Sequence, residues 1–334
     1  NKLTQSYFKI SIHDNKTSFM KNYRVTVVGG SSDVGQTLSL MLRAQPTITR
    51  LNVHDTQVQT PGVVLDLSYI PAESVLKGFV GTETLERALK DADIVIATGG
   101  LVRRPGIAKD SWLATNTTFI KMVAQKVAKM SPLPLLGILT EPVNVLVPMA
   151  AEIMRNHGDY DPRKLFGITT IDHLRAQTLY ALENNLPVQS CDVPVIGGRS
   201  GKTLIPLTSQ AKPACEMDEQ AIQEFVTKLR NCDKNVIEGK KGWAATLSVA
   251  FSALIFTRSV LDALDGRQAK VAAFIENNDF GTDYFSGVVN INHQGVTDMQ
   301  RFTDLSKYEC HLLERSIEQI RKDVLKGKKI LELA

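Results

Sequence analysis

The sequence predicts an α/β fold in which a parallel sheet forms the N-terminal half. The first observation is a short apolar strand at residues 25–28, which runs through a Gly-Gly turn into a helical pattern. The second is a strand at residues 51–55 that ends in an acid, about 20 residues beyond that turn. The third is a buried apolar strand at residues 93–100 that again ends in Gly-Gly. This order of strand, glycine turn and helix is typical of a dinucleotide-binding, or Rossmann, domain.

The glycine turn after the first strand reads GGSSDVG. In such a turn, backbone N–H groups at a helix N-terminus face the pyrophosphate of the cofactor. Gly29 and Gly35 hold the first and last glycine positions and Gln36 follows them, so these three are candidate cofactor-binding residues. Ser32 holds the middle position, and Asp33 places a carboxylate where the pyrophosphate charge would lie. We interpret Asp33 as the helix N-cap, an internal anion on the positive helix end that opposes dinucleotide binding.

Further candidate residues follow the other predicted strands. Asp55 ends the second strand, where a dinucleotide-binding fold places the carboxylate that holds the adenosine ribose. The alternative is that Asp55 serves only the turn, since Asp is common at strand ends. After the third strand comes LVRRPG, residues 101–106, a basic loop that could close over an anionic substrate. We place Asn116 at the start of the next helix and a further strand at residues 135–140, before EPVN.

Length and composition limit the class of protein. A chain of 334 residues can hold two domains around one deep cleft. The formal net charge of +4 is too small and too dispersed to indicate a nucleic-acid partner. No run of 18 apolar residues occurs, so we predict no membrane span. The four cysteines lie far apart without a CxxC pair, which indicates free thiols in a reducing intracellular compartment and no metal site.

Residues 1–22 form a predicted N-terminal extension. They contain four lysines, Lys2, Lys9, Lys16 and Lys21, against the single acid Asp14. A targeting presequence has a similar composition but usually contains arginine, which is absent here. We favour a segment that lies on the surface or docks on a neighbouring molecule.

From residue 23 onward a series of segments follows one another in a recognisable order. They are VTVVG, TPGVVLDLSYIP, DADIVIATGGLVRRPG, LATNTTFI, EPVNVLVPMAAEI, LFGITTIDHLRAQT, VPVIGGRSGKTLIPLTSQ, ATLSVA and SKYECHLLERSIEQIRKDVLKG. With these segments the chain resembles the malate dehydrogenases of the mitochondrial type, within the lactate/malate dehydrogenase superfamily. The resemblance implies an NAD-binding Rossmann domain at residues 23–167, a mixed α+β substrate domain at residues 168–334, and a homodimer. It also implies NAD as cofactor and, for the ancestor, hydride transfer between malate and NAD.

The resemblance places the catalytic positions at Asp172 and Arg199, and it places Arg175 among the substrate-binding residues. The family takes the alcohol proton with a His in GGHSG, oriented by an Asp in LD-x-x-R. Here Asp172 and Arg175 are retained, but the motif reads GGRSG and Arg199 replaces the His. Arginine stays protonated in proteins and cannot shuttle a proton near neutral pH. We expect Arg199 to form a charged pair with Asp172. His173 cannot replace the lost base, because it is adjacent to Asp172 on a helix and adjacent helical residues do not face each other.

The substrate-binding positions are changed as well. Arg103 matches the first arginine of the family's closing loop, whereas Lys109 replaces the second and loses the bidentate fork. Glu141 replaces the Asn of NPVN and adds a negative charge, which Arg199 could neutralise in an internal ion-pair network. Trp243 stands where the family has small residues, so we expect its indole to fill much of the substrate pocket. The resemblance also makes Asn116 a cofactor-binding residue. Together with the substrate-binding positions it completes the candidate site.

Two long helices are predicted in the C-terminal half. Residues 245–261 are strongly apolar and suit the core or a dimer contact, and residues 308–325 alternate apolar and charged side chains at helical spacing. The core pattern is therefore intact although the reactive positions are altered.

Two functions remain open. The first is a catalytically disabled homologue with a structural or regulatory function, in a homodimer or a larger assembly. Its basis is five substitutions expected in one cleft: Asp33, Lys109, Glu141, Arg199 and Trp243. The second is an active NAD-dependent oxidoreductase with a shifted substrate, in which Glu141 is the base and Arg199 an anion clamp. For either, the mitochondrial matrix is favoured over the cytosol.

Overall fold

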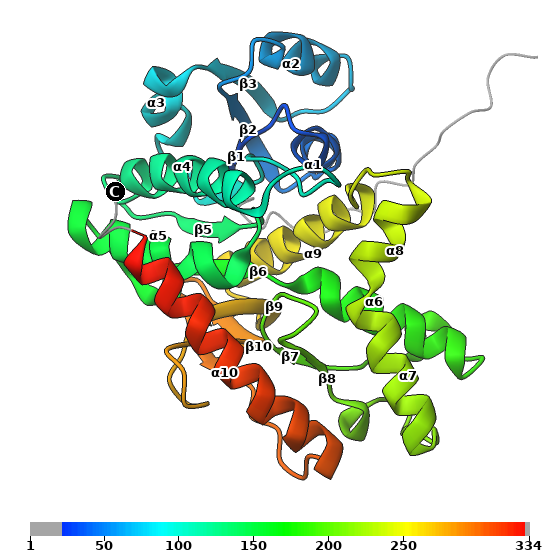
Figure 1. The fold of residues 1–334 in the computed structure, drawn as a ribbon. Helices are drawn as coiled ribbons and strands as arrows, with labels where there is room; N and C mark the ends of the chain where they lie inside the picture. Colours follow the sequence, from blue (N-terminus) through cyan, green and yellow to red (C-terminus); the bar gives the residue numbers. More distant parts are fainter. Residues whose placement is uncertain (1–21, 331–334) are drawn as a thin grey trace, which may run out of the picture.

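Parallel strands form the N-terminal half of one large sheet in this computed structural model, which describes residues 22–330. Their order across the sheet is β3-β2-β1-β4-β5-β6 (Figure 1). The chain adds β2 and β3 on one side of β1 and then crosses over to add β4, β5 and β6 on the other side. Val, Ile and Leu dominate these strands because both faces of the sheet are covered by helices. The strands are β1 (Tyr23–Val28), β2 (Ile48–Asp55), β3 (Val75–Val80), β4 (Ile94–Ala97), β5 (Leu135–Ile138) and β6 (Leu165–Ile168).

Helices connect these strands, as the predicted Rossmann arrangement requires. The predicted strands are confirmed, but their bounds differ from those expected. β1 starts two residues earlier, β2 starts three residues earlier and β5 ends two residues earlier, while β4 starts one residue later and ends three residues earlier. The predicted N-terminal extension lies outside the described residues apart from Asn22. The helices of this half are α1 (Asp33–Arg43), α2 (Thr60–Ser68), α3 (Leu85–Leu89), α4 (Lys109–Val127) and α5 (Val143–His157), with a 3-10 turn, η1 (Thr82–Thr84).

The C-terminal half continues the same sheet with antiparallel strands. β9 (Ala269–Glu276) pairs antiparallel with β6, and the order continues β9-β10-β7-β8. β11 (Gly295–Met299) pairs with β10. The mixed α/β character expected for this half is therefore confirmed. Its other strands are β7 (Val195–Gly197), β8 (Leu204–Pro206) and β10 (Tyr284–Asn292), with the 3-10 turns η2 (Pro162–Lys164), η3 (Val188–Ser190) and η4 (Thr208–Gln210).

The helices of the C-terminal half surround the antiparallel strands. α6 (Thr170–Glu183) follows β6, and the long α10 (Lys307–Lys329) runs diagonally across the front of this half in Figure 1. α10 begins with a capping box formed by Ser306 and Glu309, which satisfies N–H groups at both positions. The remaining helices are α7 (Glu219–Arg230), α8 (Cys232–Gly239) and α9 (Leu247–Leu264).

α9 is the apolar helix expected from the sequence. Its buried face includes Phe256, which packs edge-on against Phe166 of β6 with ring centroids 5.5 Å apart. Among the described helices, α9 alone is long and apolar enough to cross a membrane, and half of it is buried within the structure. Its other side carries exposed apolar residues such as Leu247 and Phe251.

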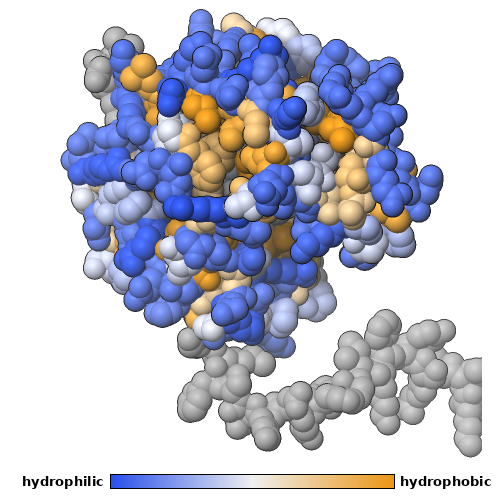
Figure 2. Space-filling view, turned by 90° about the horizontal axis from the view of Figure 1, so that it is seen from below, coloured by the Kyte–Doolittle hydropathy of each residue, from blue (hydrophilic) through white to orange (hydrophobic). Residues whose placement is uncertain are grey.

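The surface of the molecule is mixed. Figure 2, which views the molecule from below, shows hydrophilic side chains around most of the outline and apolar side chains gathered between them across the middle. The four cysteines are free: Cys191, Cys215, Cys232 and Cys310.

Candidate active site

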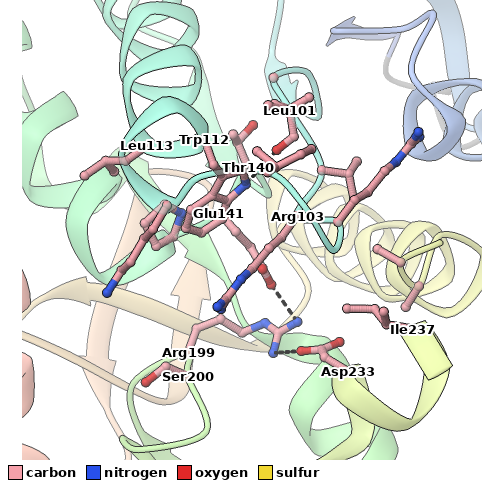
Figure 3. Close-up of a pocket in the computed structure, with 18 of the residues that line it drawn as sticks. Leu101, Arg103, Trp112, Leu113, Thr140, Glu141, Arg199, Ser200, Asp233 and Ile237 are labelled. Atoms are coloured by element: carbon pink, nitrogen blue, oxygen red, sulfur yellow. Dashed lines mark hydrogen bonds and ion pairs between the residues drawn. The ribbon is translucent and has the colours of Figure 1, made fainter. Parts of the chain in front are cut away.

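A cleft of about 1030 Å³ lies where the two halves of the molecule meet. One wall is formed by the loops that follow β4 and β5, at the carboxyl ends of the parallel strands, where ligands of open α/β sheets bind. The loop after β7, the helix α8 and the C-terminal part of α10 form the opposite wall. Figure 3 shows Arg103 and Glu141 from the first wall facing Arg199 and Asp233 from the second.

Arg199 lies at the centre of the cleft and contacts three carboxylates. Its Nη1 is 2.9 Å from Oδ1 of Asp172 and 3.4 Å from Oδ2 of Asp233, and its Nη2 is 2.9 Å from Oε1 of Glu141. The Arg199 side chain is only 6% exposed, so the guanidinium depends on these partners for its solvation. The predicted pairs of Arg199 with Asp172 and with Glu141 are therefore confirmed, and Asp233 is an additional member.

The electrostatics of this network keep Arg199 charged. Burial alone lowers the pKa of Arg199, but the carboxylates of Asp172, Glu141 and Asp233 outweigh it and raise this pKa above its usual range. Burial raises the pKa of Asp172 to about 6, although both Arg199 and Arg175 oppose that rise. A permanently protonated guanidinium thus lies where the resemblance places the histidine base.

Arg175 is engaged within the same network. Its Nη2 donates to Oδ1 of Asp233 at 2.6 Å. Burial raises the pKa of Asp233, but Arg199 and Arg175 together hold it at about 2. The sequence analysis missed Asp233 because it lies on α8 in a stretch without a recognisable motif.

His173 faces away from the cleft, as expected. Its Nε2 accepts a hydrogen bond from the backbone N–H of Val195 at 3.1 Å. Burial lowers the pKa of His173 to about 4, so the ring is neutral at physiological pH. This histidine is a packed structural residue of α6.

The substrate loop keeps its basic side chains without pairing them. Arg103 and Lys109 both line the cleft, and the Arg103 guanidinium lies 5.9 Å from the centroid of the Trp112 ring. Within the described part of the chain, neither cation forms an ion pair with a carboxylate. Figure 3 shows Arg103 extending from its loop toward Glu141. These two positions therefore remain open to an anionic ligand.

The expectation that Trp243 fills the pocket is wrong. The residue is 51% exposed and is not among the residues that line the cleft. Instead, the guanidinium of Arg104 lies 3.8 Å from the centroid of its ring, a cation–π contact. The indole is held at the outside of the loop, and the cleft stays open.

The cofactor end of the structure keeps the glycine geometry of the motif. Gly29 has a φ of +86°, and a Cβ there would lie 2.1 Å from the Gly99 nitrogen. A Cβ on Gly35 would lie 2.2 Å from the Gly29 carbonyl oxygen, so this glycine allows α1 to start directly against the turn. Both positions therefore require glycine for steric reasons.

Ser32, and not Asp33, caps the first helix, which corrects the prediction. Its hydroxyl accepts from the Gly35 N–H at 3.0 Å and donates to the Gly29 carbonyl. Asp33 is the first residue of α1, is exposed, and does not line the cleft. Asp33 and Trp243 thus leave the set of five substitutions that were expected in one cleft, and Lys109, Glu141 and Arg199 remain in it.

The other cofactor candidates are engaged with the backbone. Asp55 accepts from the N–H groups of Ser31 and Thr56 at 2.9 and 2.7 Å, and Gln36 donates to the Ser31 carbonyl. Asn116 is buried in the middle of α4 and not at a helix start, because α4 already begins at Lys109. Its side chain bridges Leu101 and the Glu141 carbonyl, so it ties the two loops of the first wall together.

A second group of polar residues, which links α5 to the opposite wall of the cleft, was not predicted. Asn144 accepts from the backbone N–H of Arg199 at 2.8 Å and donates to Asp323 of α10 at 3.0 Å. Gln319 donates to the other oxygen of Asp323. No sequence motif marks α10 as part of a site, so this link appears only in the structure.

Among the described residues, no group of three or more His, Cys, Asp or Glu side chains could hold a metal ion.

The sheet order and the position of the cleft define a protein of the dinucleotide-binding α/β class. Residues 23–167 match the family model of the lactate/malate dehydrogenase NAD binding domain, and residues 169–331 match that of the lactate/malate dehydrogenase alpha/beta C-terminal domain. The chain therefore belongs to the lactate/malate dehydrogenase family, and it is malate dehydrogenase-like in sequence. It is 34% identical to the mitochondrial malate dehydrogenase of Macaca fascicularis over 93% of this chain and 92% of that one.

Other relatives agree with this assignment. The mitochondrial malate dehydrogenase of Bos taurus is 33% identical over 95% of this chain and 94% of its own length. In fold, the chain resembles the malate dehydrogenase of Picrophilus torridus, with a TM-score of 0.80 and 21% identity over 94% of this chain and 99% of that chain. It also resembles the malate dehydrogenase of Cryptosporidium parvum, with a TM-score of 0.79 and 21% identity over 92% and 100% of the two chains.

The stability of the network can be tested with Arg199→Met. The variant leaves three carboxylates facing one another with Arg175 as their remaining cation, and breaking a buried pair in this way costs about 3–5 kcal/mol. The pKa of Asp172 is raised in the folded protein from 3.8 to about 6. Protonation of this carboxyl therefore favours the folded state at low pH, and this contribution to stability is lost as the pH rises through 6. We expect the variant to be destabilised more at about pH 7.5 than at about pH 5.

Denaturant unfolding at both pH values measures the effect. The control is Lys202→Met, which removes an exposed cation from the same loop and is expected to change stability by less than about 0.5 kcal/mol. An equal loss of stability at both pH values would contradict the proposed dependence on the carboxylates.

Proposed function

We propose that this protein has lost the hydride-transfer activity of its family and has a structural or regulatory function. The observation that carries the proposal is the buried Arg199 guanidinium bound to Asp172, Glu141 and Asp233. Oxidation of an alcohol needs a group that accepts its proton as the hydride leaves, and such acid–base catalysis contributes about 10²–10⁴-fold to rates. Arg199 keeps its proton and occupies the space that a base would need.

Two further changes in the cleft support this proposal. Glu141 brings a negative charge to the position where the family binds an anionic substrate, and its Oε1 is already bound to Arg199. Lys109 offers a point charge in place of a bidentate fork. Glu141 is thus engaged within the protein itself, and Lys109 keeps a charge without the geometry that orients a carboxylate.

Turnover measurements test the proposal directly. We expect no NADH oxidation above background when the wild-type protein is mixed with oxaloacetate or with other 2-oxo acids. The triple variant Arg199→His, Glu141→Asn, Lys109→Arg restores the family pattern and is expected to gain at least about 100-fold over the wild-type background. The single variant Arg199→His is the matched control and should gain less, since Glu141 still carries its charge.

A wild-type rate of about 1 s⁻¹ or more with any 2-oxo acid would overturn the proposal. It would also fail if Arg199→His changed an already substantial rate only modestly. Circular dichroism of each variant establishes that it is folded before its rate is compared.

A second candidate function is an active NAD-dependent oxidoreductase with a shifted substrate. It is favoured by the open cleft of about 1030 Å³ and by Arg103, which lines the cleft without an ion-pair partner among the described residues. In this case Glu141 would be the base and Arg199 an anion clamp. The same panel of 2-oxo acids decides between the two functions.

NAD would be held by the residues of the glycine turn. The turn geometry of Gly29 and Gly35 leaves the backbone able to approach a pyrophosphate, and the Asp55 carboxylate lies at the end of β2, where the ribose would be bound. When bound, NAD supplies the hydride acceptor of the family reaction. Ser32 replaces the middle glycine without distorting α1, because its hydroxyl caps the helix. What opposes binding is the charge of Asp33 in the first turn.

Asp33→Asn tests this opposition. Removing the carboxylate from the N-terminal turn of α1 lowers the repulsion of a pyrophosphate, so we expect NADH to bind roughly twofold to fivefold more tightly than to wild type. Calorimetric titration measures both dissociation constants. Asp66→Asn, the same change at an exposed position of α2, should leave the affinity unchanged. An affinity that Asp33→Asn does not alter would show that Asp33 does not oppose the cofactor.

We further propose that the chain divides into two domains, residues 23–167 and residues 168–334, and that the protein acts in the mitochondrial matrix. We also propose that it is a homodimer. Exposed apolar side chains on α1, α2 and α9 support the dimer, since α1 packs against both other helices. A large exposed apolar surface usually marks an interface. The exposed residues are Leu40, Leu65, Tyr69, Leu247 and Phe251.

Sedimentation tests the dimer. Wild-type protein should sediment at twice the chain mass of 36.8 kDa, and Phe251→Glu should shift it to the monomer because a charge then lies in the apolar contact. Leu182→Glu, at a more exposed position on α6, is the control and should stay dimeric. A monomeric wild type at micromolar concentration would contradict the dimer.

Fractionation of the native cells tests the compartment, and recovery of the protein outside the mitochondrial matrix would contradict that assignment.

A further inference from the structure

Cations without carboxylate partners surround the cleft. They are found on both walls, and in the described part of the chain none of their side chains forms an ion pair or a hydrogen bond. The Arg104 guanidinium is stacked on Trp243, while the other four extend from exposed positions. The cations are Arg103, Arg104, Lys109, Lys202 and Lys326. The other cations of the cleft are engaged: Arg230 donates to the Leu204 carbonyl, and Lys234 and Arg199 form ion pairs.

The centre of the cleft has the opposite character. Two guanidiniums, Arg175 and Arg199, face three carboxylates, Asp172, Glu141 and Asp233, so the network carries an excess of one negative charge. An anionic group placed beside Glu141 would therefore meet repulsion, whereas a hydroxyl could donate a hydrogen bond to its exposed side. The centre suits a neutral, hydroxyl-bearing part of a ligand.

The cations divide between the two walls. Arg103, Arg104 and Lys109 lie on the loop after β4 and at the start of α4, on the N-terminal side. Lys202 follows β7 and Lys326 lies near the end of α10, on the C-terminal side. Asp323, an acid of the second wall three residues before Lys326, is already bound by Asn144 and Gln319. A ligand that uses both groups of cations needs an anionic group at each end.

We propose that the cleft binds a small molecule with phosphoryl groups at two ends and a neutral, hydroxylated middle. This inference rests on the proposed loss of catalysis, because it gives the altered cleft a ligand other than the family's reactants. The volume of about 1030 Å³ is at the upper end of the range for small-molecule sites, about 300–1,000 Å³, so such a ligand fits.

Phosphoryl groups match these cations better than carboxylates do. A phosphate monoester carries about −1.5 to −2 charges at pH 7 and has three acceptor oxygens. Lysine binds phosphate well as a point charge, while bidentate recognition of a carboxylate favours arginine. Three of the five cations are lysines, including the one that replaces the family arginine, Lys109. The two cations of the second wall without an ion pair or a side-chain hydrogen bond, Lys202 and Lys326, are both lysines.

Calorimetric titration of the full-length wild-type protein with fructose 1,6-bisphosphate tests the proposal. The comparison ligands are fructose 6-phosphate, which has one phosphoryl group, fructose, which has none, and malate, which is a dicarboxylate. We expect the bisphosphate to bind at least about tenfold more tightly than fructose 6-phosphate, a difference of about 1.4 kcal/mol. Binding should weaken as salt rises, because the contacts are between exposed charges.

Lys202→Gln and Lys326→Gln should each raise the dissociation constant of the bisphosphate at least about fivefold. The matched control is Lys322→Gln, one turn earlier on α10 at an exposed position outside the cleft, which should change it less than about twofold. No binding at millimolar bisphosphate, equal effects of the three variants, or equally tight binding of malate would each overturn the inference. Turnover of a 2-oxo acid by the wild type would instead overturn the proposed function, whatever the titration shows.

Discussion

The buried guanidinium of Arg199 is the constraint on which the rest of the site depends. A buried charge is tolerated only when partners replace its hydration. Asp172 of α6, Asp233 of α8 and Glu141 from the loop after β5 provide those partners. Because they come from different elements, the guanidinium joins the two halves of the molecule across the cleft. The substitution of the histidine position and the acid at residue 141 are therefore parts of one arrangement, since Arg199 is the one ion-pair partner that Glu141 has among the described residues.

The scaffold is unaffected by these changes because it depends on other residues. The central parallel strands β1, β4, β5 and β6 are almost wholly buried, and the glycine turn is fixed by steric contacts of Gly29 and Gly35 with neighbouring backbone. None of these interactions involves the charges in the cleft. The fold therefore does not depend on the residues at the family's catalytic positions, and membership of a family of dehydrogenases does not by itself establish an activity. The rim of unpaired cations suggests that the cleft still has a ligand.

Sequence reasoning was most reliable where a residue's partners follow from a motif. The pairs of Arg199 with Asp172 and with Glu141 were expected from the family positions and are present. It failed where the outcome depends on how a side chain is directed. Trp243 lies at the outside of the loop because Arg104 offers it a cation–π contact, and Ser32 caps α1 because its hydroxyl, and not the Asp33 carboxylate, reaches the Gly35 N–H. Neither direction is encoded in local sequence spacing.

The sequence by itself determined the α/β class, the order of strands and helices, and the charge at each altered position of the site. These follow from hydrophobic periodicity and glycine positions, which act over a few residues. Only the tertiary structure decided that Asp233 completes the Arg199 network, that Asn144 links this network to Asp323, and that Lys326 of α10 faces the cleft. These contacts join segments far apart in the chain, and long-range proximity is set by packing of the whole sheet and its helices.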